Sequence, residues 1–95
     1  MFTLIAKITI DTMHIEFVTS ELQKLIKPSR AKDGCLSYTM YKDKKEDNVI
    51  FFIEKWESND VFIRHMKSDL ILNYTKRTEG MVKKIELNKI EEIIE

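Results

Sequence analysis

The segment from Val49 to Trp56 (VIFFIEKW) constrains the fold more than any other part of the chain, because it is apolar on both sides. Successive side chains of a strand point to opposite faces of its sheet. One face would carry Val49, Phe51 and Ile53, and the other Ile50, Phe52, Glu54 and Trp56. The helices of a small domain cover one sheet face, so the second apolar face needs another cover. In a chain of 95 residues the simplest cover is a second copy packed sheet to sheet, and we expect a homodimer.

Hydrophobic periodicity assigns the rest of the chain to alternating strands and helices. Strands are predicted at residues 2–10, 35–42, 49–56 and 82–87. A helix is predicted between the first two strands, capped by Asp11 or Thr12 and ending near Pro28. A second helix, broken in two, is expected between Ser58 and Gly80. This β-α-β-β-α-β order is typical of the ferredoxin-like α+β fold, an antiparallel sheet with helices on one face.

Charge and composition exclude several classes of partner. The 16 basic and 16 acidic residues give a formal net charge of zero, so no strong field steers the chain to nucleic acid or to an anionic membrane. No apolar run approaches the ~20 residues of a membrane span, and a single cysteine excludes an internal disulfide. We expect one cytoplasmic domain over residues 1–95, with no nucleic-acid or membrane partner. The conformation of residues 89–95 stays open.

An ordered set of residues resembles the antibiotic biosynthesis monooxygenase domain family over about residues 3–88. The set comprises Pro28-Ser29-Arg30, Gly34-Cys35-Leu36-Ser37-Tyr38, Tyr41, Asp43, Phe52, Glu54, Trp56, Glu57, Ser58, His65 and Ser68. The resemblance implies a dimeric ferredoxin-like fold with a small pocket in each subunit between sheet and helices. Members of the family oxidise quinols with O₂ without metal or flavin, degrade haem, isomerise small molecules, or have no known activity. Fold alone does not choose among these activities.

Candidate catalytic residues are His65 and Trp56. Imidazole titrates near neutrality, so His65 could take a phenolic proton and leave an electron-rich anion that reduces O₂ directly. Trp56 could hold the flat ring of the substrate. In the competing interpretation His65 caps a helix C-terminus, where a cation is favoured, and Trp56 belongs to the core. Candidate substrate-binding residues are Glu54, Tyr38, Phe52, Phe62 and Tyr74, and the competing interpretation assigns each of them to packing or to structural hydrogen bonds.

The sequence predicts no metal or other cofactor. The two histidines lie far apart, without a cysteine or carboxylate cluster at ligand spacing. With only two glycines the chain cannot build a Gly-rich phosphate loop. Haem-degrading members of the family have an Asn on the first strand and a His late in the last helix. Here the first strand has no Asn and Thr75 is nearest the ligand position, so haem degradation is disfavoured.

The favoured function is cofactor-independent monooxygenation of a small quinol-like or polyphenolic aromatic molecule. The alternative is a non-catalytic, small-molecule-binding or stress-related dimer of the same fold. Buried polar groups clustered around His65 would favour the enzyme. A pocket filled by Trp56 and Phe62 would favour the binding protein.

Overall fold

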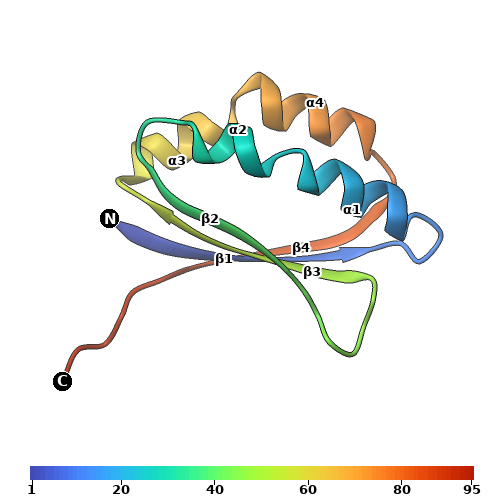
Figure 1. Cartoon of the computed structure of the whole chain (residues 1–95), viewed down its shortest axis with the longest axis horizontal. Coiled ribbons are helices and arrows are strands. Elements are labelled where there is room, and N and C mark those ends of the chain that lie inside the picture. The colour runs from blue at the N-terminus through green and yellow to red at the C-terminus, as the bar shows by residue number, and fades with distance from the viewer.

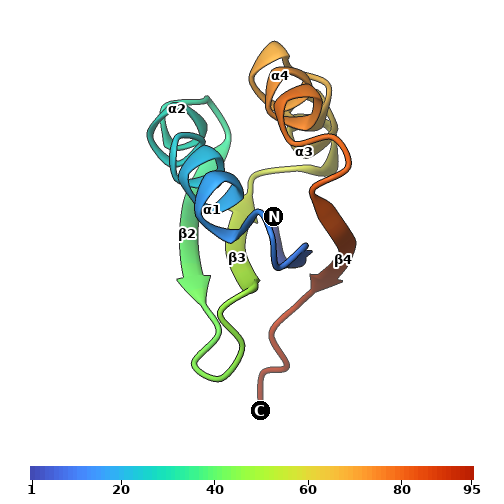
Figure 2. The ribbon, with the colours of Figure 1, turned by 90° about the vertical axis from the view of Figure 1, so that its right-hand side faces the viewer.

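A computed structural model describes all 95 residues as one antiparallel four-stranded sheet covered on one face by helices (Figures 1 and 2). The elements in order are β1 (Phe2–Ile10), α1 (Ile15–Gln23), α2 (Ile26–Arg30), β2 (Cys35–Lys42), β3 (Val49–Trp56), α3 (Asn59–Met66), α4 (Asp69–Arg77) and β4 (Val82–Ile90). The strands lie in the order β2-β3-β1-β4. The predicted ferredoxin-like α+β fold is confirmed.

The buried face of the sheet is built by strict alternation along β1. Leu4, Ala6, Ile8 and Ile10 are all buried, whereas the residues between them are only half-buried. The pairing of β1 with β3 places Ala6 opposite Phe52 and Leu4 opposite Glu54. A carboxylic acid therefore lies in the middle of the apolar, helix-covered face.

Both helical connections are broken in two, whereas the sequence predicted a break only in the second. α1 ends at Gln23, and Pro28 lies inside the first turn of α2 instead of ending a single helix. Proline is tolerated there because the first N–H groups of a helix have no intrahelical partner. Asp11 does not cap α1: its Oδ1 accepts from the Met13 N–H at 3.0 Å, and His14 occupies the N-cap position. Ser58 caps α3, and its side chain accepts from the Val61 N–H.

Gly34 holds α3 close to the start of β2. Its φ of +88° lies in the left-handed region that favours glycine. A Cβ at this position would meet Val61 Cγ1 of α3 at 2.6 Å, and the Gly34 carbonyl accepts from the Glu57 N–H at 2.8 Å. The helix that carries His65 can approach the sheet this closely only because residue 34 lacks a side chain.

The chain ends beyond the sheet. β4 runs through Ile90, and residues 91–95 have no regular structure and lead away from the fold (Figure 1). None of the helices is both long and apolar enough to cross a membrane.

Candidate functional site

A partly open cavity of about 120 Å³ lies between the sheet and the helices. Its walls are mostly aliphatic, and polar atoms come chiefly from Tyr38, Glu54, His65 and Tyr74. Ile85 and Leu87 of β4 also line it and are about half exposed. The cavity therefore approaches solvent on the side of β4. We call it the interior cavity.

Glu54 supplies the carboxyl group of the interior cavity. On β3 it lies between Leu4 of β1 and Tyr38 of β2, and only 6% of it is exposed. Burial raises its pKa to about 7, and a hydrogen bond donated by Trp56 Nε1 to Glu54 Oε1 at 2.9 Å partly opposes that rise. A carboxyl group with this pKa exchanges a proton near neutral pH.

His65 lies in α3 with its ring against Trp56. The ring centroids are 4.6 Å apart with an interplanar angle of 34°, and His65 is 3% exposed. Burial, and then the nearby charge of Lys32, lower its pKa to about 4, so the imidazole is neutral at pH 7. The sequence predicted an imidazole that titrates near neutrality, and that prediction is wrong because the residue is desolvated.

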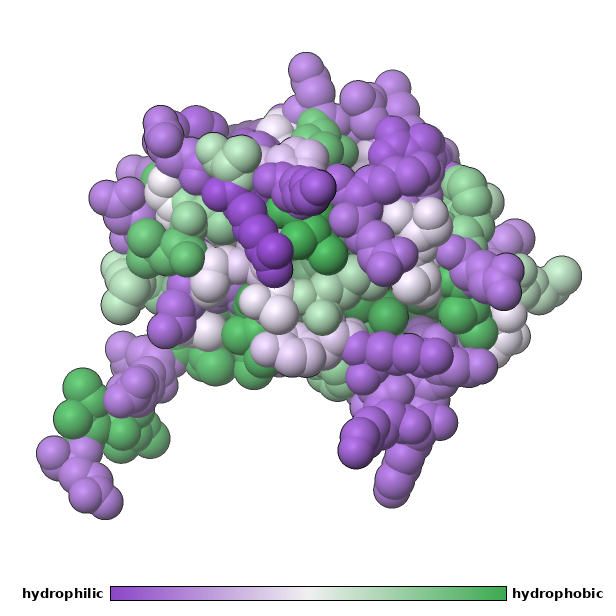
Figure 3. Space-filling model, viewed as in Figure 1, coloured by the Kyte–Doolittle hydropathy of each residue, from purple (hydrophilic) through white to green (hydrophobic).

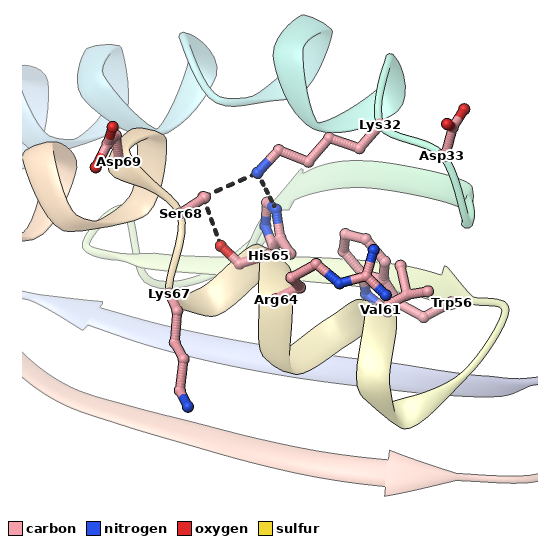
Figure 4. Close-up of a pocket in the computed structure, with 9 residues that line it drawn as sticks. All are labelled: Lys32, Asp33, Trp56, Val61, Arg64, His65, Lys67, Ser68 and Asp69. Carbon is pink, nitrogen blue, oxygen red and sulfur yellow. Dashed lines mark hydrogen bonds between the residues drawn. The ribbon is translucent and has the colours of Figure 1, made fainter.

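Two side chains, Lys32 and Ser68, form a hydrogen-bonded cluster with His65 on its outer side (Figure 4). Lys32 Nζ lies 3.0 Å from His65 Nδ1 and donates to Ser68 Oγ at 2.8 Å. Ser68 Oγ donates to the His65 carbonyl at 2.6 Å. The cluster faces an open groove of about 570 Å³ that is also lined by Arg64 and by the buried Trp56. His65 therefore forms part of the wall between this outer groove and the interior cavity.

Two tyrosine hydroxyls complete the polar part of the interior cavity. Burial raises the pKa of Tyr38 and of Tyr74, so both stay protonated at neutral pH. The Tyr74 hydroxyl is buried and makes no hydrogen bond of normal geometry, although the Thr78 side chain lies close enough to lower its pKa. Buried polar groups are nearly always paired, so an orphan hydroxyl beside a cavity indicates a place for a ligand atom or a water molecule.

The structure separates the candidate residues into two groups. Five of them line the interior cavity together: Tyr38, Phe52, Glu54, His65 and Tyr74. Trp56 lines the outer groove instead, and Phe62 packs against Trp56 with ring centroids 6.0 Å apart and lines neither space. No group of three or more His, Cys, Asp or Glu side chains is placed to hold a metal ion.

Sequence reasoning missed Lys32 as a neighbour of His65. The two residues are 33 positions apart, and nothing in the pattern around a loop lysine indicates that it will reach a histidine on another helix. Ser68 had a signal, since it belongs to the set of residues that resembles the family. In the structure it occupies the N-cap position of α4, but its hydroxyl makes no cap hydrogen bond there.

Comparison with known proteins connects this chain to a family. A family model described as antibiotic biosynthesis monooxygenase matches residues 1–77. An uncharacterised protein of Synechocystis, sll1783, is 32% identical over 73 residues, which cover 77% of this chain and 50% of the relative. The chain therefore spans about half the length of that curated relative.

Solved structures show the same fold. The crystal structure of PA3566 from Pseudomonas aeruginosa has a TM-score of 0.93 and 29% identity, covering 98% of this chain and 94% of that chain. Another structure, described as an antibiotic biosynthesis monooxygenase, has a TM-score of 0.92 and 19% identity, covering 99% of this chain and 100% of its own. With the family model matching most of its length, the chain belongs to the antibiotic biosynthesis monooxygenase family.

Proposed function

We propose that the protein is a cofactor-independent monooxygenase that acts on a single-ring quinol or polyphenol in the interior cavity. The observation that carries the proposal is Glu54, a buried carboxyl group with a pKa of about 7 in an apolar cavity. An acid tuned in this way is suited to accept a substrate proton at neutral pH. Its family supports a monooxygenase-like protein.

The size of the cavity supports a substrate with one ring. An engineered apolar cavity of roughly 150 Å³ binds benzene, and the interior cavity measures about 120 Å³. Typical ligand sites are larger, on the order of 300–1,000 Å³. A fused-ring quinol would fit only if the helices moved away from the sheet, so single-ring substrates are favoured.

Glu54 is a better base for a phenol than His65. A phenol has a pKa of about 10. Proton transfer to Glu54, with a pKa of about 7, costs about 4 kcal/mol, and transfer to His65, with a pKa of about 4, costs about 8 kcal/mol. We therefore assign the proton transfer to Glu54. Tyr74 would donate to or accept from the second ring oxygen, which would give its orphan hydroxyl a partner.

The proposed reaction balances without an external reductant. Deprotonated quinol transfers electrons to O₂, and a C–O bond forms at the ring. The O–O bond then breaks, one oxygen atom stays on the ring and the other leaves as water. The net conversion is quinol plus O₂ to hydroxyquinone plus water, and the quinol supplies all the electrons. The cofactor-independent form of the proposal rests on the sequence, which has two distant histidines without a ligand cluster and too few glycines for a phosphate loop.

We also propose that the protein works as a homodimer in the cytoplasm. The face of the sheet opposite the helices carries Ile5, Phe51 and Ile53 at its centre. Hydrophobic surface shows along the lower edge of the sheet, between the hydrophilic β2–β3 loop and the C-terminal tail (Figure 3). This apolar centre, surrounded by polar residues such as Lys7 and Glu86, supports an interface with a second copy. A single free thiol, Cys35, fits a reducing compartment.

Oxygen uptake tests the proposed activity. Purified protein should consume O₂ with a single-ring hydroquinone and form the hydroxyquinone, with much less turnover of a naphthohydroquinone. The rate should rise with pH through about 7, because the carboxylate form of Glu54 is the active one. Glu54→Gln should lower turnover by about 10² to 10⁴. Glu57→Gln makes the same chemical change at an exposed position and should keep activity. An active Glu54→Gln protein would remove Glu54 from the reaction.

One observation favours the non-catalytic alternative. Trp56 is completely buried and Phe62 packs against it, so these rings fill the space that the sequence assigned to a substrate ring. A binding protein would take a phenol into the interior cavity without consuming O₂. Trp56 is the only tryptophan and lies beside Glu54, so its fluorescence should report binding. Fluorescence titration without O₂ uptake across a panel of quinols would establish this alternative.

A further inference from the structure

One ring nitrogen of His65 is occupied by a lysine. Lys32 reaches from the loop after α2 across the outer groove, and its ammonium lies 3.0 Å from His65 Nδ1 (Figure 4). An ammonium group has protons and no lone pair, so it can only donate. Nδ1 must then be the unprotonated acceptor, and the single proton of the neutral imidazole must be on Nε2. We propose that Lys32 is a positioning residue that fixes His65 as the Nε2–H tautomer, which makes the imidazole a hydrogen-bond donor toward the interior cavity.

Ser68 holds the Lys32 ammonium in this position. Its hydroxyl donates to the His65 carbonyl at 2.6 Å, so its lone pairs are free to accept from Lys32 Nζ at 2.8 Å. A serine at the N-cap position usually accepts from the backbone of its own helix, and Ser68 makes no such bond to α4. The hydroxyl is turned toward Lys32 and His65 instead, which closes a ring of three hydrogen bonds between the loop and the α3–α4 junction.

No carboxylate neutralises Lys32. The ion pairs of the structure are Lys24–Glu21, Arg77–Glu21 and Lys84–Glu86. Asp33 and Asp69 line the same groove, but their carboxylates point away from the ammonium (Figure 4). The charge of Lys32 therefore acts on His65 directly and opposes protonation of the ring. Burial also lowers the pKa of His65, so burial and the charge of Lys32 together keep the imidazole neutral.

The other ring nitrogen is available to a ligand. His65 lines the interior cavity, and its Nε2 makes no hydrogen bond to the protein. The role of this nitrogen rests on the proposed function. In that reaction Glu54 takes the phenolic proton, and the Nε2–H of His65 donates to the resulting phenolate oxygen. The assignment of the tautomer itself does not depend on any activity.

Nitrogen-15 NMR of the histidine rings tests the tautomer directly, because protonated and unprotonated ring nitrogens resonate far apart. At pH 7 the wild-type protein should show His65 with a bare Nδ1 and a protonated Nε2. The titratable or charged groups around the ring are Lys32, Glu54, Tyr38 and Tyr74, with Asp33, Arg64, Lys67 and Asp69 at the groove. Titration of Glu54 should move the His65 signals without moving the proton between the nitrogens. A wild-type Nδ1–H would overturn the proposal without any variant.

Two substitutions separate positioning from packing. Lys32→Met keeps the aliphatic stem and removes the charge, so His65 should become a mixture of tautomers and its titration midpoint should rise from about 4. Lys32→Arg should restore the Nε2–H form. Lys27→Met is the matched control, since Lys27 is exposed on α2 and lines neither space. His14, at the start of α1, serves as an internal reference whose signals should not change.

Two outcomes would contradict the role of Lys32. Either an unchanged tautomer and midpoint in Lys32→Met, or the same change in Lys27→Met, would show that the cation does not position the ring. If Lys32→Met does not fold, Ser68→Ala provides the second variant, because it removes the acceptor that holds the ammonium. None of these measurements requires O₂ consumption, so they succeed or fail independently of the proposed function.

Discussion

The carboxyl group of Glu54 accepts a hydrogen bond from the indole N–H of Trp56 at 2.9 Å, within one strand and away from solvent. The two residues are two positions apart on β3, so they point to the same face. The bond favours the charged carboxylate, whereas burial favours the neutral acid, and burial has the larger effect. The near-neutral pKa of Glu54 is thus the result of two opposing contributions that can be separated by mutation.

Trp56→Phe should raise the pKa of Glu54 above about 7, because it removes the N–H donor that favours the carboxylate. The titration of the Glu54 carboxyl carbon, followed by ¹³C NMR, measures this shift. Phe62→Leu is the control, since it changes packing against Trp56 and leaves the hydrogen bond in place. A Glu54 midpoint that falls or stays constant in Trp56→Phe would show that the indole donor has no influence on the acid.

Glu54 and His65 should affect stability with opposite dependence on pH. The pKa of Glu54 is raised from 4.5 to about 7, so its contribution is most favourable below pH 4.5 and is lost as pH rises through 7. The pKa of His65 is lowered from 6.5 to about 4, so its contribution is present above pH 6.5 and is lost as pH falls through 4. Each amounts to about 3 kcal/mol. Between pH 4.5 and 6.5 the two contributions largely cancel in the wild-type protein.

Replacing either residue with an uncharged glutamine should reveal its contribution to the pH dependence of stability. The free energy of unfolding of Glu54→Gln, relative to wild type, should increase by about 3 kcal/mol between pH 4.5 and 7. That of His65→Gln, relative to wild type, should increase by about the same amount as pH falls from 6.5 to 4. Urea denaturation at a series of pH values measures both. Parallel curves for wild type and either variant would mean that the residue titrates normally in the folded protein.

Local pattern was enough to place the strand residues of the site, because alternation depends only on neighbouring residues. Phe52, Glu54 and Trp56 lie on the helix-covered face as predicted. The same rule fails at Leu36, which strict alternation would place on the face of Tyr38. A register irregularity between Cys35 and Ser37 intervenes, and Leu36 is 52% exposed.

The pKa values of the site residues could not be predicted from the hydrophobic pattern of the sequence. The pKa of His65 depends on how deeply α3 packs and on an ammonium from a loop far away in the chain. The surroundings of Trp56 likewise depend on Phe62 and His65, which pack against it from α3 and which strand alternation does not place. Residue types and faces are local properties, whereas burial and the position of Lys32 arise from packing between distant segments.

Gly34→Ala should destabilise the protein by about 3 kcal/mol, combining backbone strain at positive φ with overpacking against Val61. Gly80→Ala is a matched control, because Gly80 has a φ of +79° but no atom within 4 Å of the place that a Cβ would take. That variant should lose only about 1 kcal/mol. Adding Val61→Ala to Gly34→Ala should recover part of the loss in urea denaturation. Equal losses at the two glycines would show that the approach of α3 imposes no steric limit.

The proposed dimer predicts that a charge at the centre of the open sheet face prevents association. Ile53 lies between Ile5 and Thr39 on that face and is 38% exposed. A specific interface buries at least about 1,200 Å² in total, and Ile53→Asp would place an unpaired carboxylate inside it. Sedimentation velocity at micromolar concentration should show a dimer for wild type and a monomer for Ile53→Asp. Leu72→Asp, on the exposed side of α4, should remain dimeric. A monomeric wild-type protein, or a dimeric Ile53→Asp protein, would exclude this face as the interface.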